Sequence, residues 1–366
     1  MRADWTYKTW ADVLTIINGK NQSAVESANG EFPIYGSGGI MGYASEWLCP
    51  ENSVIIGRKG NINKPLFVTT KFWNVDTAFG LCAKKESLLP KYLFYFCIDY
   101  NFERHNKAVT IPSLTKADLL KISILVPPIN VQQSIVSELD KINELIGLKA
   151  SQLKELDNLS LSLFYDMFGD PVENEKGWEV KRLGEICTIE RGGSPRPITD
   201  YITESPDGIN WIKIGDAEEG SMYIKSTKER IRPEGMKKSR FVHKGDFILS
   251  NSMSFGRPYI LEIDGCIHDG WLVIHDDNNV FEKVYLYHML SHPSMFSQFK
   301  NLAVGGVVNN LNSKLVRNVK VFVPSRKQQQ SFASKISAVE HAKAVLNAQI
   351  KDLNTLLASR IQYWFD

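Results

Sequence analysis

The chain has 366 residues, of which 43% are hydrophobic and 23% charged, and its formal net charge is +2. This length suits two or three domains, and the composition is that of ordinary folded proteins, which argues against disorder. The weak net charge argues against a protein that coats DNA by charge alone. Apolar runs far shorter than the roughly 20 residues of a membrane span predict no membrane segment. The charged start MRADW and five scattered cysteines without a CxxC spacing predict a cytoplasmic protein with reduced thiols.

The first half of the chain begins with a tryptophan-anchored segment, residues 5–13, and continues through strand-like runs such as residues 53–56 and 66–69. A glycine-containing loop, residues 57–65, joins these two runs. Glycine lets the backbone approach a ligand closely, arginine and lysine suit phosphate or guanine, and asparagine suits adenine in the major groove. The side chains of this loop that we predict to contact DNA are Arg58, Lys59, Asn61, Asn63 and Lys64. A solvated hairpin loop would have the same composition, so that interpretation stays open.

A long helix with coiled-coil periodicity closes each half. Apolar residues recur from Ile135 at alternating steps of four and three, and the pattern returns 197 residues later from Phe332. Two such helices in one chain predict a coiled coil, which is antiparallel if a twofold axis relates two similar domains. The alternative is that each amphipathic helix covers a separate core. The predicted seam residues are Ile135, Leu139, Ile142, Ile146, Leu153, Leu156, Leu163, Phe332, Ile336, Val339, Leu346, Ile350, Leu353 and Leu357.

The second half starts after a linker, residues 170–177, whose proline and glycine end the first long helix. Its strand-like runs include residues 211–214, 247–249 and 259–263, and a loop at 250–258 corresponds to the loop of the first half. The residues predicted to contact DNA here are Arg191, Arg196, Lys213, Asn251, Ser252, Ser254 and Arg257. The basic stretch 225–244 is expected to hold phosphates, which position a protein on DNA without specifying sequence.

The second half of the sequence restates the first. A Val-Pro pair followed by Gln-Gln occurs at residues 126–133 and again at 323–330, and the opening tryptophan segments also match, but at a different shift. The halves therefore agree at their ends and differ in their middles. We expect an α+β fold with two pseudo-repeated domains, each with a mixed β-sheet and followed by a long helix. The predicted segments are a first β-rich domain (1–128), a first helix (129–170), a second β-rich domain (171–325) and a second helix (326–366).

No complete catalytic motif occurs in the sequence. There is no GxxxxGK[ST] phosphate loop, and the one Pro-Pro pair lacks the flanking residues that hold an amino group for methylation. Asp170 with residues 179–181 has a nuclease-like composition but no preceding strand. His288 and His292 lack a third metal ligand, and Cys266 and His268 alternate as any strand residues do. We therefore predict no catalytic, cofactor-binding or metal-binding residue.

Several motifs occur together along the whole chain. They are the opening segments WTYKTWADV and WEVKRLGEI, IPSLTKADL at residues 111–119, Val-Pro-Pro with Gln-Gln at 126–133, and MFGD at 167–170. With these motifs the chain resembles the specificity subunits of type I restriction-modification systems. The second half departs from the pattern at residues 308–311, where asparagine replaces proline, and at Lys343 and Arg360 within the predicted seam.

The resemblance implies a non-catalytic subunit with two target recognition domains, each of which reads one half of a split, asymmetric DNA site across a spacing set by the helices. It implies double-stranded DNA, two methyltransferase subunits and restriction subunits with translocase activity as partners in host defence. S-adenosylmethionine, ATP and magnesium would be bound by those partners and not by this chain. The alternative function is a coiled-coil scaffold or regulatory protein without sequence-specific DNA reading, whose loops would face away from a common groove.

Overall fold

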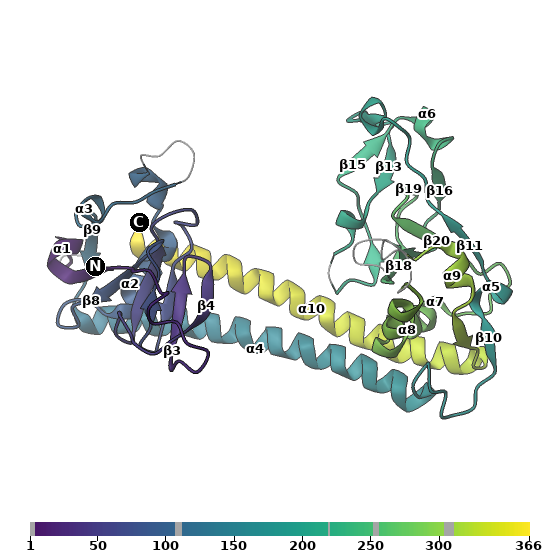
Figure 1. Ribbon diagram of the computed structural model, residues 1–366, viewed down its shortest axis with the longest axis horizontal. Coiled ribbons are helices and arrows are strands. Elements are labelled where there is room, and N and C mark those ends of the chain that lie inside the picture. Colours follow the sequence, from purple (N-terminus) through teal and green to yellow (C-terminus); the bar gives the residue numbers. More distant parts are fainter. Residues whose placement is uncertain (1–3, 107–111, 219, 252–255, 304–310) are drawn as a thin grey trace. The chain divides into compact units, whose positions relative to one another are not determined.

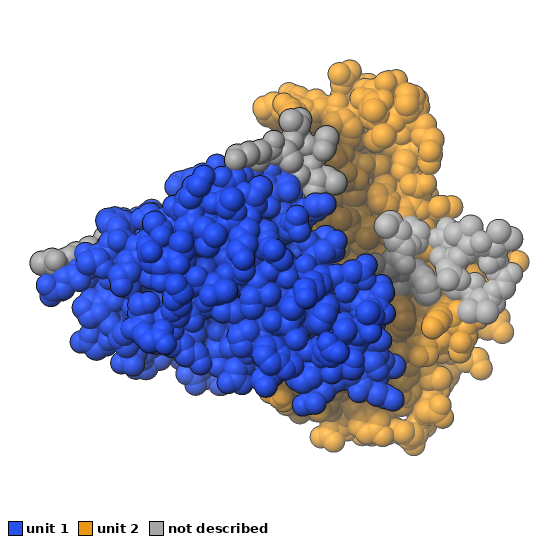
Figure 2. Space-filling view, turned by 60° about the vertical axis from the view of Figure 1, so that its left-hand side comes forward, with its two compact units in different colours: residues 1–151, 346–366 blue, residues 152–345 orange. Residues whose placement is uncertain are grey.

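The computed structural model of the chain describes residues 4–106, 112–218, 220–251, 256–303 and 311–366. It contains two compact units, residues 1–151 with 346–366 (unit 1) and residues 152–345 (unit 2), which are coloured separately in Figure 2. Each unit combines one β-rich half of the chain with parts of two long helices, α4 (Ile129–Phe168) and α10 (Arg326–Phe365). The α+β class predicted from the sequence is confirmed.

In unit 1 the described strands form a four-stranded antiparallel sheet in the order β2-β8-β5-β6, a three-stranded sheet in the order β4-β3-β7, and the pair β1-β9. Fully buried Trp10 packs edge-on against Phe96 and Phe102 in the core that the larger sheet shares with α2. The strands are β1 (Thr6–Thr9), β2 (Leu14–Asn18), β3 (Phe32–Gly36), β4 (Gly39–Ala44), β5 (Ser53–Gly57), β6 (Leu66–Val68), β7 (Trp73–Asn74), β8 (Ala78–Ala83) and β9 (Ser123–Val126). The short helices are α1 (Trp10–Val13), α2 (Pro90–Asp99), η1 (Phe102–His105) and α3 (Lys116–Leu119).

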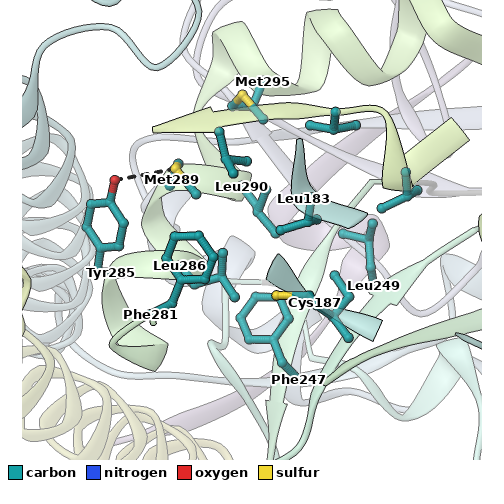
Figure 3. Close-up of a cluster of buried hydrophobic side chains, with 14 of the residues drawn as sticks. Leu183, Cys187, Phe247, Leu249, Phe281, Tyr285, Leu286, Met289, Leu290 and Met295 are labelled. Atoms are coloured by element: carbon teal, nitrogen blue, oxygen red, sulfur yellow. Dashed lines mark hydrogen bonds between the residues drawn. The ribbon is translucent and has the colours of Figure 1, made fainter. Parts of the chain in front are cut away.

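Unit 2 has two five-stranded sheets, in the orders β11-β20-β17-β18-β14 and β12-β15-β13-β19-β16, and the pair β10-β21. The strands are β10 (Val180–Arg182), β11 (Thr188–Arg191), β12 (Ile202–Thr203), β13 (Ile209–Ile212), β14 (Tyr223–Ile224), β15 (Glu229–Ile231), β16 (Arg240–Val242), β17 (Phe247–Ser250), β18 (Pro258–Leu261), β19 (Gly265–Ile267), β20 (Trp271–His275) and β21 (Lys320–Phe322). The helices are α5 (Leu183–Ile186), η2 (Ile198–Asp200), η3 (Ile214–Asp216), α6 (Pro233–Met236), α7 (Lys283–Ser291), α8 (Pro293–Ala303) and α9 (Ser313–Arg317). Figure 3 shows part of the core, where Phe247 and Leu249 of β17 meet Leu286 and Leu290 of α7.

The two units share one scaffold. The order β2-β8-β5-β6 of unit 1 returns as β11-β20-β17-β18 in unit 2, with every neighbouring pair antiparallel, and the pair β1-β9 returns as β10-β21. Two pseudo-repeated domains, as predicted, are therefore present. Each unit also has a second sheet, β4-β3-β7 in unit 1 and the larger β12-β15-β13-β19-β16 in unit 2, which lies on the far side of the β11-β20 sheet from α7 and α8 (Figure 1). The shared strands form the constant part of each domain, and the halves differ in the size of the second sheet and in β14, which extends the first sheet of unit 2.

A buried glutamine explains the repeated Gln-Gln motif. In unit 1 the Gln132 side chain is fully buried; its Oε1 accepts a hydrogen bond from the Leu89 amide (2.8 Å), and its Nε2 donates to the carbonyls of Ser87 (2.9 Å) and Pro127 (2.8 Å). The Gln329 side chain repeats this arrangement in unit 2 with the same number of partners. Those partners are the Glu282 amide (2.7 Å) and the carbonyls of Val280 (3.1 Å) and Pro324 (2.9 Å). The motif therefore ties the start of each long helix to the start of α2 or α7.

The predicted strands agree with β5, β6, β17 and β18 to within a few residues, but the prediction for residues 211–214 is wrong at its end. Strand β13 stops at Ile212 because the Asp216 carboxylate accepts a hydrogen bond from the Lys213 amide (2.8 Å) and starts the short helix η3. Lys213 therefore lies at the turn between β13 and η3, where its side chain pairs with Glu229 of β15.

The long helices α4 and α10 contact each other inside each unit. In unit 2 the Phe164 ring lies 5.6 Å from the Phe332 ring, and Asp157 pairs with Lys343, so the α10 number falls as the α4 number rises and the helices are antiparallel there. In unit 1, Glu138 pairs with Arg360. All fourteen predicted seam residues are buried or half-buried, whereas the exposed leucines Leu145 and Leu148 lie between seam positions. A continuous coiled coil and the four predicted segment boundaries stay predictions.

Candidate nucleic-acid interface

The loop predicted to read DNA in unit 1 follows β5 and folds tightly on itself. A Cβ added to Gly57 would lie 2.3 Å from the Asn61 carbonyl oxygen, and Gly60 has a φ of +74°, so both positions require glycine. The Arg58 amide donates to the Thr77 carbonyl (2.8 Å), and its guanidinium carbon lies 5.7 Å from the centre of the Phe79 ring. The loop therefore presents its side chains from a fixed backbone.

The five predicted side chains of this loop differ in what they can still bind. Lys59, Asn61 and Lys64 are exposed, and Arg58 is half-buried with a long hydrogen bond to the Asp76 carbonyl (3.5 Å). The Asn63 amide is already engaged: its Oδ1 accepts from the Phe102 amide (2.8 Å) and its Nδ2 donates to Asn101 (3.3 Å). Asn63 therefore holds the loop against η1, and the other four have more capacity for a ligand.

Two loops of unit 2 converge on Asp269, which lies in a third loop. Its Oδ1 accepts a hydrogen bond from the Ser194 hydroxyl (2.7 Å), and its Oδ2 pairs with Arg196 Nη2 (3.4 Å). Its backbone carbonyl accepts from Arg191 Nε and from Asn251 Nδ2, both at 3.0 Å. The structure thus brings together three predicted residues from two loops, Arg191, Arg196 and Asn251, around a residue from a third.

Lys213, a fourth predicted residue, lines the same hollow as Arg196. The hollow has a volume of about 690 Å³, and its walls include Pro195, Trp211 and His268 as well as these two cations. Each cation faces a carboxylate there, because Lys213 pairs with Glu229 and Arg196 with Asp269. The hollow therefore carries hydrogen-bond donors and acceptors with little net charge.

The charges of this hollow follow from its hydrogen bonds and its burial. The Ser194 hydroxyl, as the largest cause, lowers the pKa of the Asp269 carboxyl, which keeps it ionised at neutral pH. Burial lowers the pKa of His268, which keeps that ring neutral. With the His268 ring neutral and the Asp269 carboxylate ionised, the cations that line this hollow are Arg196 and Lys213.

The remaining predicted residues of unit 2 lie elsewhere. Arg257 is exposed and lines a second hollow of about 440 Å³ with Tyr259 and Phe296, so it is not part of the Asp269 cluster. Ser252 and Ser254 lie outside the described residues, as do residues 308–310 of the departure from the family pattern. Strand β17, which precedes the loop of Ser252 and Ser254, holds the place in its sheet that β5 holds in the sheet of unit 1.

Some cations of the basic stretch 225–244 already have hydrogen-bond partners within the protein. The Arg240 guanidinium donates to the Glu190 carboxylate (2.8 Å), and the Arg230 guanidinium donates to the Pro206 carbonyl (3.1 Å). Lys225, Arg232 and Lys237 are exposed. These exposed cations are the members of the stretch best suited to phosphates.

Comparison with known proteins bears on this arrangement. The model of a family described as type I restriction modification DNA specificity domain matches residues 2–158 and 175–355, one copy on each half of the chain. The chain belongs to this family. The resemblance seen in the sequence motifs is confirmed, and the chain is a specificity subunit, the component of such complexes that is not catalytic.

Relatives of this specificity subunit match it over most of their length. A protein of Haemophilus influenzae, named as a type I restriction enzyme specificity subunit, is 24% identical over 347 residues, which cover 91% of this chain and 87% of that protein. The MjaVIII specificity subunit of Methanocaldococcus jannaschii is 21% identical over an alignment of 407 positions, which spans 98% of this chain and 93% of that protein. The crystal structure of an S subunit from M. genitalium has the same fold, with a TM-score of 0.59, 16% identity and coverage of 99% and 96%. A chain from a structure of type I restriction-modification complex assembly gives a TM-score of 0.62, 17% identity and coverage of 98% and 97%.

Sequence reasoning missed the residue at the centre of the unit 2 cluster. Asp269 was not among the residues predicted to contact DNA, although it lies close in sequence to Cys266 and His268. Burial raises the pKa of the Cys266 thiol to about 11, which opposes a reactive thiolate. The sequence signal for Asp269 was its place next to Gly270, directly before the buried strand β20. Nothing in the local sequence linked it to Arg196 and Arg191, which lie 73 and 78 residues earlier.

The two charges that interrupt the second half of the predicted seam of the specificity subunit have partners. Lys343 Nζ lies 2.7 Å from Asp157 Oδ1 and 2.9 Å from Glu340 Oε1, and Arg360 donates to the Glu138 carboxylate. Both cations therefore occupy seam positions as ion pairs.

Within the described ranges, no group of three or more His, Cys, Asp or Glu side chains is placed to hold a metal ion. The same residues include no helix long and apolar enough to span a membrane.

Proposed function

We propose that this specificity subunit reads a split, asymmetric DNA site, with one half-site bound by the recognition domain of each unit. The observation that carries the proposal is one scaffold built twice with different side chains on equivalent loops. The loop after β5 carries half-buried Arg58 and exposed Lys59 and Asn61, whereas the loop after β17 begins with buried Asn251 and presents exposed Arg257 at its end. Different side chains on the same frame select different base sequences, because donors and acceptors at base edges specify DNA.

We also propose that α4 and α10 form a continuous antiparallel coiled coil that sets the spacing between the half-sites. The supporting contacts are Glu138 with Arg360 in unit 1 and Asp157 with Lys343 in unit 2, which follow one antiparallel register. Each helix has 40 residues. At 1.5 Å per residue this length is roughly 60 Å, more than the 34–36 Å of one DNA turn.

Two methyltransferase subunits and the restriction subunits are the proposed protein partners. Exposed apolar side chains on the helices support docking there, since large exposed hydrophobic residues mark interaction surfaces. They include Leu145, Leu148 and Leu159 of α4 and Leu356 of α10. In this proposal the partners bind S-adenosylmethionine, ATP and magnesium in the cytoplasm, and the specificity subunit itself binds DNA and the partners.

The test is to co-express the chain with its modification subunit, purify the complex and map methylated adenines across a genome by single-molecule sequencing. A split motif with a fixed gap is the expected result. A stable complex that methylates no defined motif would favour a scaffold without sequence-specific reading. Failure to form any complex would contradict the proposed partners.

A further inference from the structure

We propose that Asp269 positions Arg196 to read a guanine, so that the hollow of unit 2 recognises a G·C base pair in the second half-site. The inference rests on the proposed function, because it assumes that unit 2 contacts DNA. It adds a positioning residue, Asp269, and a base pair to that function.

The geometry around Asp269 is built to hold a fixed shape. A Cβ added to Gly192 would lie 2.2 Å from the His268 carbonyl oxygen, and one added to Gly270 would lie 2.1 Å from the His268 ring, so the chain segments pack without room for a side chain. The Ser194 hydroxyl fixes one carboxylate oxygen of Asp269 at 2.7 Å. The other oxygen is thereby directed to Arg196, and a preorganised partner lowers the entropy that an arginine loses on binding.

Arg196 keeps most of its binding capacity. Its side chain is 79% exposed, and among the described residues its one hydrogen-bond partner is Asp269, through Nη2 at 3.4 Å. A guanidinium has five N–H donors in a fixed fork, so donors remain for the O6 and N7 acceptors of guanine. The Asp269 carboxylate, whose side chain is 43% exposed, can accept from the N4 amino group of the paired cytosine.

The charge balance favours a base edge over a phosphate. The carboxylates of Asp269 and Glu229 line the same hollow as Arg196 and Lys213, and each pairs with one of these cations. A phosphate entering the hollow would meet two negative charges. A G·C edge presents both acceptors and a donor, which matches a wall of mixed donors and carboxylate acceptors.

The experiment uses the full chain in complex with its methyltransferase partner. After the methylated motif is mapped, methylation rates are measured on duplexes that carry each single base-pair substitution, for the natural complex and for Arg196→Ala, Arg196→Lys and Asp269→Asn. We expect all three variants to lose roughly 5- to 150-fold of the preference for one G·C pair in the half-site read by unit 2. Selectivity in the other half-site and the spacing should not change, which shows that the variants are folded.

The Arg196→Lys variant distinguishes recognition of a guanine from a general effect of positive charge. Lysine keeps the positive charge but lacks the pair of N–H donors that can bind both acceptors of a guanine. Rescue by lysine, an equal loss of rate on every duplex, or unchanged selectivity in all three variants would overturn the inference while the split motif of the natural complex stands. Exposed Arg232→Ala serves as the matched control and should alter no base preference. A natural complex that methylates no split motif would instead overturn the proposed function, and the inference with it.

Discussion

Replacing Gln132 with alanine should destabilise unit 1 and leave unit 2 intact. The substitution removes three hydrogen bonds of 2.8–2.9 Å from a fully buried side chain. At roughly 1 kcal/mol for each bond, with a further ~1 kcal/mol or more for backbone groups left without partners, the cost is roughly 3–5 kcal/mol. A loss of stability of this size raises the equilibrium constant for local opening of unit 1 by more than about 100-fold.

Amide hydrogen exchange read by mass spectrometry measures this opening region by region, which suits a chain of two units better than one unfolding midpoint. Exchange should accelerate at residues 87–93 and 127–135 in Gln132→Ala, and Gln329→Ala should act on residues 280–290 and 324–332 instead. The exposed neighbours offer matched controls, since Gln133→Ala and Gln330→Ala remove no buried contact. Equal effects of Gln132→Ala and Gln133→Ala, or an effect spread over both units, would refute the reasoning.

Three further predictions concern DNA reading, pH and the helix pair. Arg58→Ala or Arg257→Ala should weaken selection of one half-site and leave the other unchanged in a methylation assay; an equal loss on all DNA would indicate a phosphate contact instead. Burial, with Lys343 as a lesser cause, lowers the pKa of His288 to about 4, so the unfolded chain binds a proton below about pH 6.5 while the folded one does not. The free energy of unfolding of unit 2 should therefore fall by roughly 3 kcal/mol from pH 6.5 to 4, and His288→Leu should flatten that slope in urea titrations; an unchanged slope would argue against it. Lys343→Met should change that free energy by less than about 1 kcal/mol at neutral pH, because methionine keeps the apolar stem and the partner carboxylates of Asp157 and Glu340 stay accessible to water, so that these ion pairs add little net stability; a loss of more than about 3 kcal/mol would contradict this.

The two repeated domains and the long helices were predictable because their signals are local or periodic. Apolar residues at steps of four and three point to one side of a helix wherever the helix is placed, and α4 and α10 begin at Ile129 and Arg326, where the repeated Val-Pro motifs end. The matching halves predicted one scaffold built twice. Most strand predictions followed from β-branched and aromatic runs between glycines in the same way.

The candidate site depended on contacts that no spacing encodes. Asn63 was predicted to contact DNA from its loop composition, but the fold places η1 against it and uses its amide. Gln132 was visible as a repeated motif, yet its role follows from the backbone groups of residues 87–89, more than forty positions away.

What the sequence by itself determined was the repeat, the class of fold and the types of side chain available at each loop. The tertiary structure alone decided which of them meet, because Arg191, Arg196 and Asn251 reach Asp269 only when three loops from different strands pack together. Hydrogen bonds between distant segments form wherever packing brings donor and acceptor within about 3 Å. That packing is set by the buried cores of the sheets, and so the shape of the reading surface is a property of the whole unit.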